Sequence, residues 1–177
     1  MPALSQEDLI FWEQNGYVVV RGAVPPGNCR VAAEAVWEFL GMNSADPDTW
    51  YPDPPRRNIM VEMFHHQALW DNRQAPKIHE AFSQIWETDR LWVSLDRASL
   101  NPPQREQYAY TGPFLHWDFD LTRPVQLLVQ GVLYLTDTAA DQGAFACIPG
   151  FHHHLLPWLA NLPQDVDPRE EVRKRHA

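Results

Sequence analysis

Hydrophobic residues recur at helical spacing in three segments early in the chain. Segment 4–16 predicts a short helix that Ser5 caps and Gly16 closes. Segment 25–42 predicts a second helix with an apolar stripe along one face. Segment 75–87 predicts a third, in which hydrophobic residues stand four and three positions apart. Helices are therefore expected to come first in the fold.

Strands are predicted where β-branched and aromatic residues form short runs, some of them alternating with polar residues. Segment 17–24 predicts a buried strand directly after the first helix, and segment 58–64 predicts another. Four more are expected in the later part of the chain, at 90–100, 112–120, 125–135 and 143–149. No helical segment separates these four, so we expect an α+β fold in which helices back a mainly antiparallel sheet.

The composition is that of an ordinary globular protein, with 45% hydrophobic and 21% charged residues among 177. This length predicts a single domain spanning residues 1–177. The net charge of −9 argues against partners such as nucleic acid or a membrane surface. Cys29 and Cys147 lie far apart, without the spacing of metal ligands, which favours a reduced, cytoplasmic protein.

His116 and Asp118 are the residues whose pattern points most directly to chemistry. They lie two positions apart on a predicted strand, so both project from one face, while Leu115, Trp117 and Phe119 project from the other. An imidazole and a carboxylate side by side are ligand types of the two-histidine, one-carboxylate triad of non-haem iron(II) oxygenases. Taken alone, the pair is more typical of a strand with one solvated face, on which His and Asp are ordinary polar residues.

The motifs around the pair, in their order along the chain, resemble the phytanoyl-CoA dioxygenase family. The helix-to-strand segment 11–26, "FWEQNGYVVVRGAVPP", is similar to the opening of that family. The H-x-D pair is followed by a buried strand, a turn and a "PG-x-H" motif. The matching residues are His116, Asp118, Thr136, Asp137, Gly143, Pro149, Gly150 and His152, with Phe151 where serine is commoner.

This resemblance implies a double-stranded β-helix, a cupin-like jelly roll, with the N-terminal helices packed on one sheet. It implies hydroxylation of a small organic substrate by O2, with Fe(II) as cofactor and 2-oxoglutarate as co-substrate. His116 and Asp118 would then be two of the three iron ligands. Relatives that halogenate carry a small residue at the carboxylate position, so Asp118 favours hydroxylation.

The resemblance also suggests contacts with the co-substrate. Arg97 precedes the pair and suits a carboxylate through paired hydrogen bonds, although a surface or salt-bridged arginine is an equal alternative. Gln130 and Tyr134 share one face of the next predicted strand and are candidates to line the same cavity; the alternative is a buried amide and a core tyrosine. His152 is not expected to bind the metal.

The third iron ligand is the part of the pattern for which this chain offers no match. The family places a second histidine, followed by an arginine, well beyond the "PG-x-H" turn. His176 is the only later histidine here, and it lies in a charged, helix-like tail. We therefore expect the final strands of the jelly roll to be missing from the chain. Two other readings stay open, a binding protein with a jelly-roll cavity but no metal centre and a cupin-like protein that uses another metal.

Overall fold

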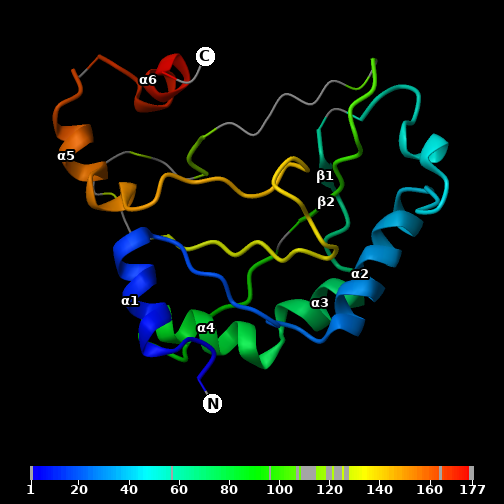
Figure 1. Cartoon of the computed structure of the whole chain (residues 1–177), viewed down its shortest axis with the longest axis horizontal. Coiled ribbons are helices and arrows are strands. Elements are labelled where there is room, and N and C mark those ends of the chain that lie inside the picture. The colour runs from blue at the N-terminus through cyan, green and yellow to red at the C-terminus, as the bar shows by residue number, and fades with distance from the viewer. Residues whose placement is uncertain are drawn as a thin grey trace. The chain divides into compact units, whose positions relative to one another are not determined.

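The computed structural model (Figure 1) describes residues 2–56, 58–95, 97–106, 108, 115–118, 121, 125, 128–163 and 165–175. The chain divides into two compact units. The first comprises Met1–Ser5, Val19–Tyr110 and Tyr134–Gly143, and the second comprises Gln6–Val18, Thr111–Leu133 and Ala144–Ala177. The prediction of one domain over the whole chain stays a prediction.

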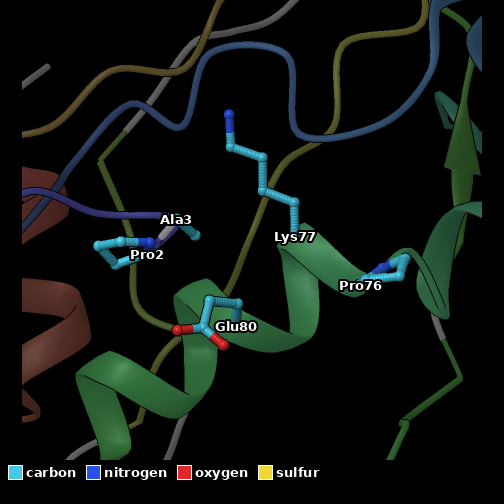
Figure 2. A pocket seen from close by; sticks show the side chains of 5 residues that line it. All are labelled: Pro2, Ala3, Pro76, Lys77 and Glu80. Carbon is cyan, nitrogen blue, oxygen red and sulfur yellow. The ribbon is translucent and has the colours of Figure 1, made fainter.

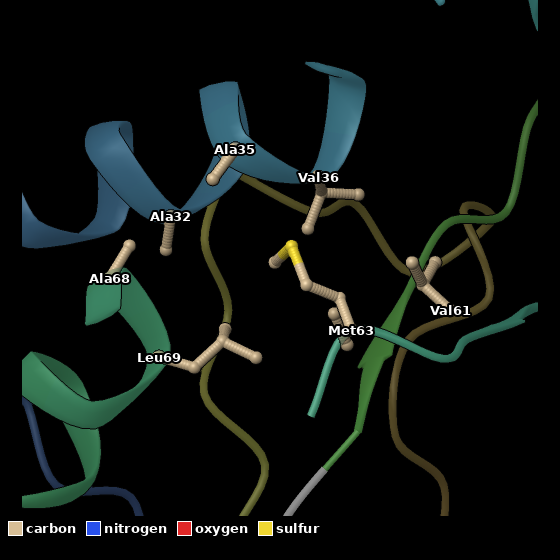
Figure 3. Packing of buried hydrophobic residues seen from close by; sticks show 8 residues of the cluster. Ala32, Ala35, Val36, Val61, Met63, Ala68 and Leu69 are labelled. Atoms are coloured by element: carbon tan, nitrogen blue, oxygen red, sulfur yellow. The ribbon is translucent and has the colours of Figure 1, made fainter. Parts of the chain in front are cut away.

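The core of the first unit lies between two helices and a short antiparallel sheet. Helix α2 (Pro26–Phe39) and helix α3 (Gln67–Arg73) pack beside strands β1 (Met60–Val61) and β2 (Ala98–Ser99). Figure 3 shows Met63 reaching from the segment after β1 towards Val36 of α2. The buried cluster consists of Ala32, Ala35, Val36, Val61, Met63, Ala68, Leu69 and Ala98. In the sheet, Met60 pairs with Ser99 and Val61 with Ala98.

Two further elements complete the first unit. They are helix α4 (Pro76–Trp86) and the 3-10 turn η1 (Pro47–Trp50). Gln84 of α4 holds the N-terminal segment through two hydrogen bonds. The Leu4 amide donates to Gln84 Oε1 over 2.8 Å, and Gln84 Nε2 donates to the Leu4 carbonyl over 2.9 Å. Because the side chain of Leu4 is also buried, these bonds fix an apolar anchor 80 residues away in sequence.

The second unit is built on short helices. It contains α1 (Gln6–Asn15), the 3-10 turn η2 (Phe151–His153), α5 (Leu155–Ala160) and α6 (Pro168–Arg175). Asp167 caps α6 by accepting a hydrogen bond from the Arg169 amide over 2.8 Å. None of the helices in the described part of the chain has both the length and the apolar character needed to span a membrane.

The predicted helices are confirmed as α1, α2 and α4, with their ends displaced by only one to three residues. Strands are confirmed in part: β1 lies inside 58–64, and β2 lies inside 90–100. The buried strand at 17–24 was wrong, because that segment carries no strand and Val19 is 63% exposed.

The later strands are not seen either. The described residues of 125–135 and of 143–149, and residues 115–118 within 112–120, carry no strand. Across the described ranges the sheet has two strands, so a jelly roll is not seen there. The physical reason is that a strand forms only when another segment pairs with it, and the sequence of one segment does not show which partner it has.

Candidate functional site

His116 and Asp118 lie next to each other in the second unit, at the surface. Nε2 of His116 is 3.4 Å from Oδ1 of Asp118, and the two side chains are 52% and 55% exposed. Leu115 and Trp117, the residues that alternate with them, are partly buried. Over these four residues, exposure therefore alternates as the sequence pattern suggested, with the polar pair towards water; Phe119, the third residue of the apolar face, lies outside the described residues.

The spacing of these two atoms suits a shared metal ion. Nitrogen and oxygen ligands lie about 2.1 Å from a first-row transition metal, so two of them are about 3.0 Å apart at a right angle and about 3.4 Å apart at a tetrahedral angle. The observed 3.4 Å falls at the upper end of this range. This is the tetrahedral spacing, and the right-angle positions of an octahedral facial triad would need the two atoms about 0.4 Å closer together. Within the described ranges, no group of three or more His, Cys, Asp or Glu side chains is arranged to hold a metal ion.

An aromatic cluster holds the residue between the two candidate ligands. The indole of Trp117 stacks on Trp158 of α5, with ring centroids 5.6 Å apart and planes 28° apart. Phe151 of η2 completes the cluster, at 6.3 Å from Trp117 and 6.2 Å from Trp158. Such ring contacts stabilise the packing beyond the area that they bury. The cluster fixes the backbone from which His116 and Asp118 project.

The "PG-x-H" turn lies against the C-terminal end of α1. The Gly150 amide donates to the Asn15 carbonyl over 2.9 Å. The ring Nε2 atoms of His152 and His153 lie 2.8 and 2.9 Å from the Glu13 carbonyl oxygen. These bonds satisfy carbonyl groups that the end of a helix leaves without partners. His152 thus contacts a backbone carbonyl.

The two predicted co-substrate contacts lie on different parts of the chain. Arg97 is exposed and directly precedes β2 in the first unit. Gln130 is exposed and belongs to the second unit, which also holds His116 and Asp118. Tyr134, also exposed, belongs to the first unit and makes further contacts. The expected burial of Gln130 and Tyr134, as an amide and a core tyrosine, is therefore wrong.

Two hollows are lined by described residues of the first unit. Figure 2 shows the larger, of about 630 Å³, between the N-terminal segment and α4; the residues described as lining it are Pro2, Ala3, Pro76, Lys77 and Glu80. A smaller hollow of about 370 Å³ includes Tyr51, Tyr108 and Arg105, whose guanidinium lies 3.9 Å from the centre of the Tyr51 ring. Neither set of described lining residues contains a residue that the sequence predicted for the site.

The comparison with protein families matches almost the whole chain. The model of the family described as "Phytanoyl-CoA dioxygenase (PhyH)" matches residues 12–173. The chain belongs to the phytanoyl-CoA dioxygenase family. This family has a cupin-like jelly-roll fold and generally depends on Fe(II) and 2-oxoglutarate, which places the chain in an oxidoreductase family.

Two curated relatives support this membership at low identity. The "Ava biosynthesis cluster protein O" of Aspergillus versicolor is 24% identical over 149 residues, which cover 78% of this chain and 48% of the relative. A "Putative phytanoyl-CoA dioxygenase" of Dictyostelium discoideum is 23% identical over 193 aligned positions, which cover 80% of this chain and 54% of the relative. The chain thus spans about half the length of these relatives. No solved structure matches the chain.

Sequence reasoning found the H-x-D pair but missed the contacts that surround it. Trp117 was expected on an apolar face, whereas its partner Trp158 lies in a helix that was not predicted. The contact of His152 and His153 with α1 was also missed. Gly16 and the "PG-x-H" motif were the available signals, but nothing in the local pattern joins positions 139 and 140 residues apart.

Proposed function

We propose that this chain carries two iron ligands of an Fe(II)- and 2-oxoglutarate-dependent dioxygenase that hydroxylates a small organic substrate with O2. The observation that carries the proposal is the 3.4 Å separation of His116 Nε2 and Asp118 Oδ1. This pair stands in a chain of the phytanoyl-CoA dioxygenase family, where such ligands are used. The wide separation of its two cysteines supports a reducing, cytoplasmic location.

Each residue has a defined part in this proposal. When bound, Fe(II) together with 2-oxoglutarate and O2 supplies the oxidant. His116 provides a neutral nitrogen and Asp118 an anionic oxygen. The packed ring of Trp117 holds in place the backbone segment that carries both. A carboxylate at 118 occupies a coordination position, which favours hydroxylation over halogenation. Arg97 would pair with a carboxylate of 2-oxoglutarate, and Gln130 would donate or accept one hydrogen bond.

A second function is favoured by one observation. The part of the chain that the structure describes contains no group of three possible metal ligands. A jelly-roll protein that binds a small molecule without a metal centre fits that observation as well. The two functions differ in whether the H-x-D pair binds a divalent metal, and this difference can be measured directly.

The test is titration of the metal-free chain with Mn(II) or Co(II) in a calorimeter. Two protein ligands leave most coordination positions to water, so we expect weak binding, with a Kd on the order of 10 µM or weaker. His116→Ala and Asp118→Asn should each abolish it, and His154→Ala, which removes another exposed imidazole of the second unit, should not. No binding at all would favour the metal-free binding protein, and binding that survives both substitutions would overturn the role of the H-x-D pair, because the metal would then be held by other residues.

A further inference from the structure

We propose that Gly16 and His152 are positioning residues for the H-x-D pair. They fix the turn that contains η2 to the end of α1, and this turn carries part of the aromatic cluster that packs on Trp117. The inference rests on the proposed function only where it concerns metal affinity. The contact itself is a property of the second unit and can be tested without metal.

The first step is the attachment of the turn to the helix. Three bonds join them, from the Gly150 amide to the Asn15 carbonyl and from the rings of His152 and His153 to the Glu13 carbonyl. All three are 2.8–2.9 Å long and therefore well formed. Because they reach two different carbonyl groups in the last turn of α1, those of Glu13 and Asn15, they fix both the place and the direction of the turn.

The second step is the close approach that glycine permits at position 16. Gly16 follows the last residue of α1 with φ +75, a left-handed conformation, and its amide donates to the Trp12 carbonyl over 2.8 Å. A Cβ built on Gly16 would lie 2.6 Å from Nδ1 of His152. This is closer than non-bonded atoms approach, so any side chain at 16 must displace the His152 ring.

The third step leads from the turn to the candidate ligands. Phe151, in the same turn, has its ring centroid 6.3 Å from that of Trp117, and Trp158 contacts both rings, at 5.6 Å from Trp117 and 6.2 Å from Phe151. Trp117 stands between His116 and Asp118 in sequence. A displacement of His152 therefore moves a neighbour of the ring that holds both ligands. Residues that orient metal ligands in this way affect metal affinity strongly.

The chain offers a matched control for the backbone effect. Gly41 also closes a helix with a left-handed conformation, at φ +64, but a Cβ there would have nothing within 4 Å. Gly16→Ala and Gly41→Ala therefore carry a similar conformational cost, whereas only the first drives an atom into His152. The difference between the effects of the two substitutions is therefore due to the contact between position 16 and the His152 ring.

The readout is the pair of imidazole C–H signals of His116 in the NMR spectrum, identified by their loss in His116→Ala. Without metal, we expect these signals to shift in Gly16→Ala and to keep their positions in Gly41→Ala. With Mn(II), we expect the affinity of Gly16→Ala to fall by about 10-fold or more, and that of Gly41→Ala to stay at the wild-type value. Unchanged His116 signals in a folded Gly16→Ala protein, or equal shifts in both variants, would overturn the proposal.

A second variant decides the matter if Gly16→Ala does not fold. Trp158→Leu leaves the bonds at the end of α1 in place and removes the ring that stacks on Trp117. The His116 signals should shift here too. Unchanged signals would contradict the proposal that the aromatic cluster fixes the position of His116. If the wild-type chain binds no Mn(II) while the signals respond as expected, the positioning role stands and the proposed function fails.

Discussion

Replacement of Met63 by alanine tests whether the cluster between α2, α3 and β1 is the core of the first unit. Met63 is 3% exposed. The change removes three heavy-atom groups beyond Cβ, and at about 0.8 kcal/mol for each buried group the transfer term alone is about 2.4 kcal/mol. The space left beside Val36 adds a cavity term, so we expect a loss of about 3 kcal/mol, within the range of about 2–5 kcal/mol seen for such truncations.

Met60→Ala is the matched control, because the same side chain is removed three residues earlier from a position that is 43% exposed. We expect it to cost less than about 1 kcal/mol. Urea unfolding followed by circular dichroism measures the free energy of unfolding. Hydrogen exchange at the amides of α2 confirms that the loss occurs in the first unit. Equal losses in the two variants would show that Met63 does not lie in the core.

Two further predictions concern single side chains. Gln84→Glu removes the donor to the Leu4 carbonyl and places a carboxylate against it, so it should cost about 1–3 kcal/mol in urea unfolding. Gln74→Glu, at the exposed C-terminal end of α3, should cost less than about 1 kcal/mol, from the helix dipole alone. Burial of the thiol raises the pKa of Cys147, although the residue as a whole is exposed. The neutral thiol is therefore favoured in the fold. The stability of the fold relative to the unfolded chain is highest below the unfolded pKa of this thiol and falls as pH rises through the folded pKa. In a Cys29→Ser variant, the pH midpoint of iodoacetamide alkylation should be higher for the folded chain than for the chain in urea, and an equal or lower midpoint would contradict the shift.

The helices of this fold could be predicted from the sequence because their hydrogen bonds are local. In α2 and α4 the apolar residues repeat at helical spacing, and in α1 and α2 a glycine stands directly or shortly after the last residue. Helix α3 was missed although its signals were present. His66 caps it by accepting from the Ala68 amide, and its buried residues Ala68, Leu69 and Asn72 follow helical spacing over only seven residues.

The strands and the surroundings of the candidate site could be predicted only in part. The alternation of polar and apolar residues gave the correct exposed face for His116 and Asp118, because it depends only on the two-residue repeat of an extended backbone. It did not identify partners, so segment 17–24 was taken for a buried strand from its valines alone, and Val19 is exposed. The packing of Trp117 on Trp158 joins positions 41 residues apart and has no local signature.

The contact of two imidazoles with one carbonyl oxygen determines where their protons lie. A carbonyl can only accept, so both His152 and His153 carry a hydrogen on Nε2, and together they use the two lone pairs of the Glu13 oxygen. In the neutral rings the free lone pair is then on Nδ1. For His152, this atom faces the α-carbon of Gly16, so an added proton would enter the space that the missing side chain leaves. Nitrogen-15 spectra should accordingly give the same tautomer for both rings, with the proton on the nitrogen farther from the backbone.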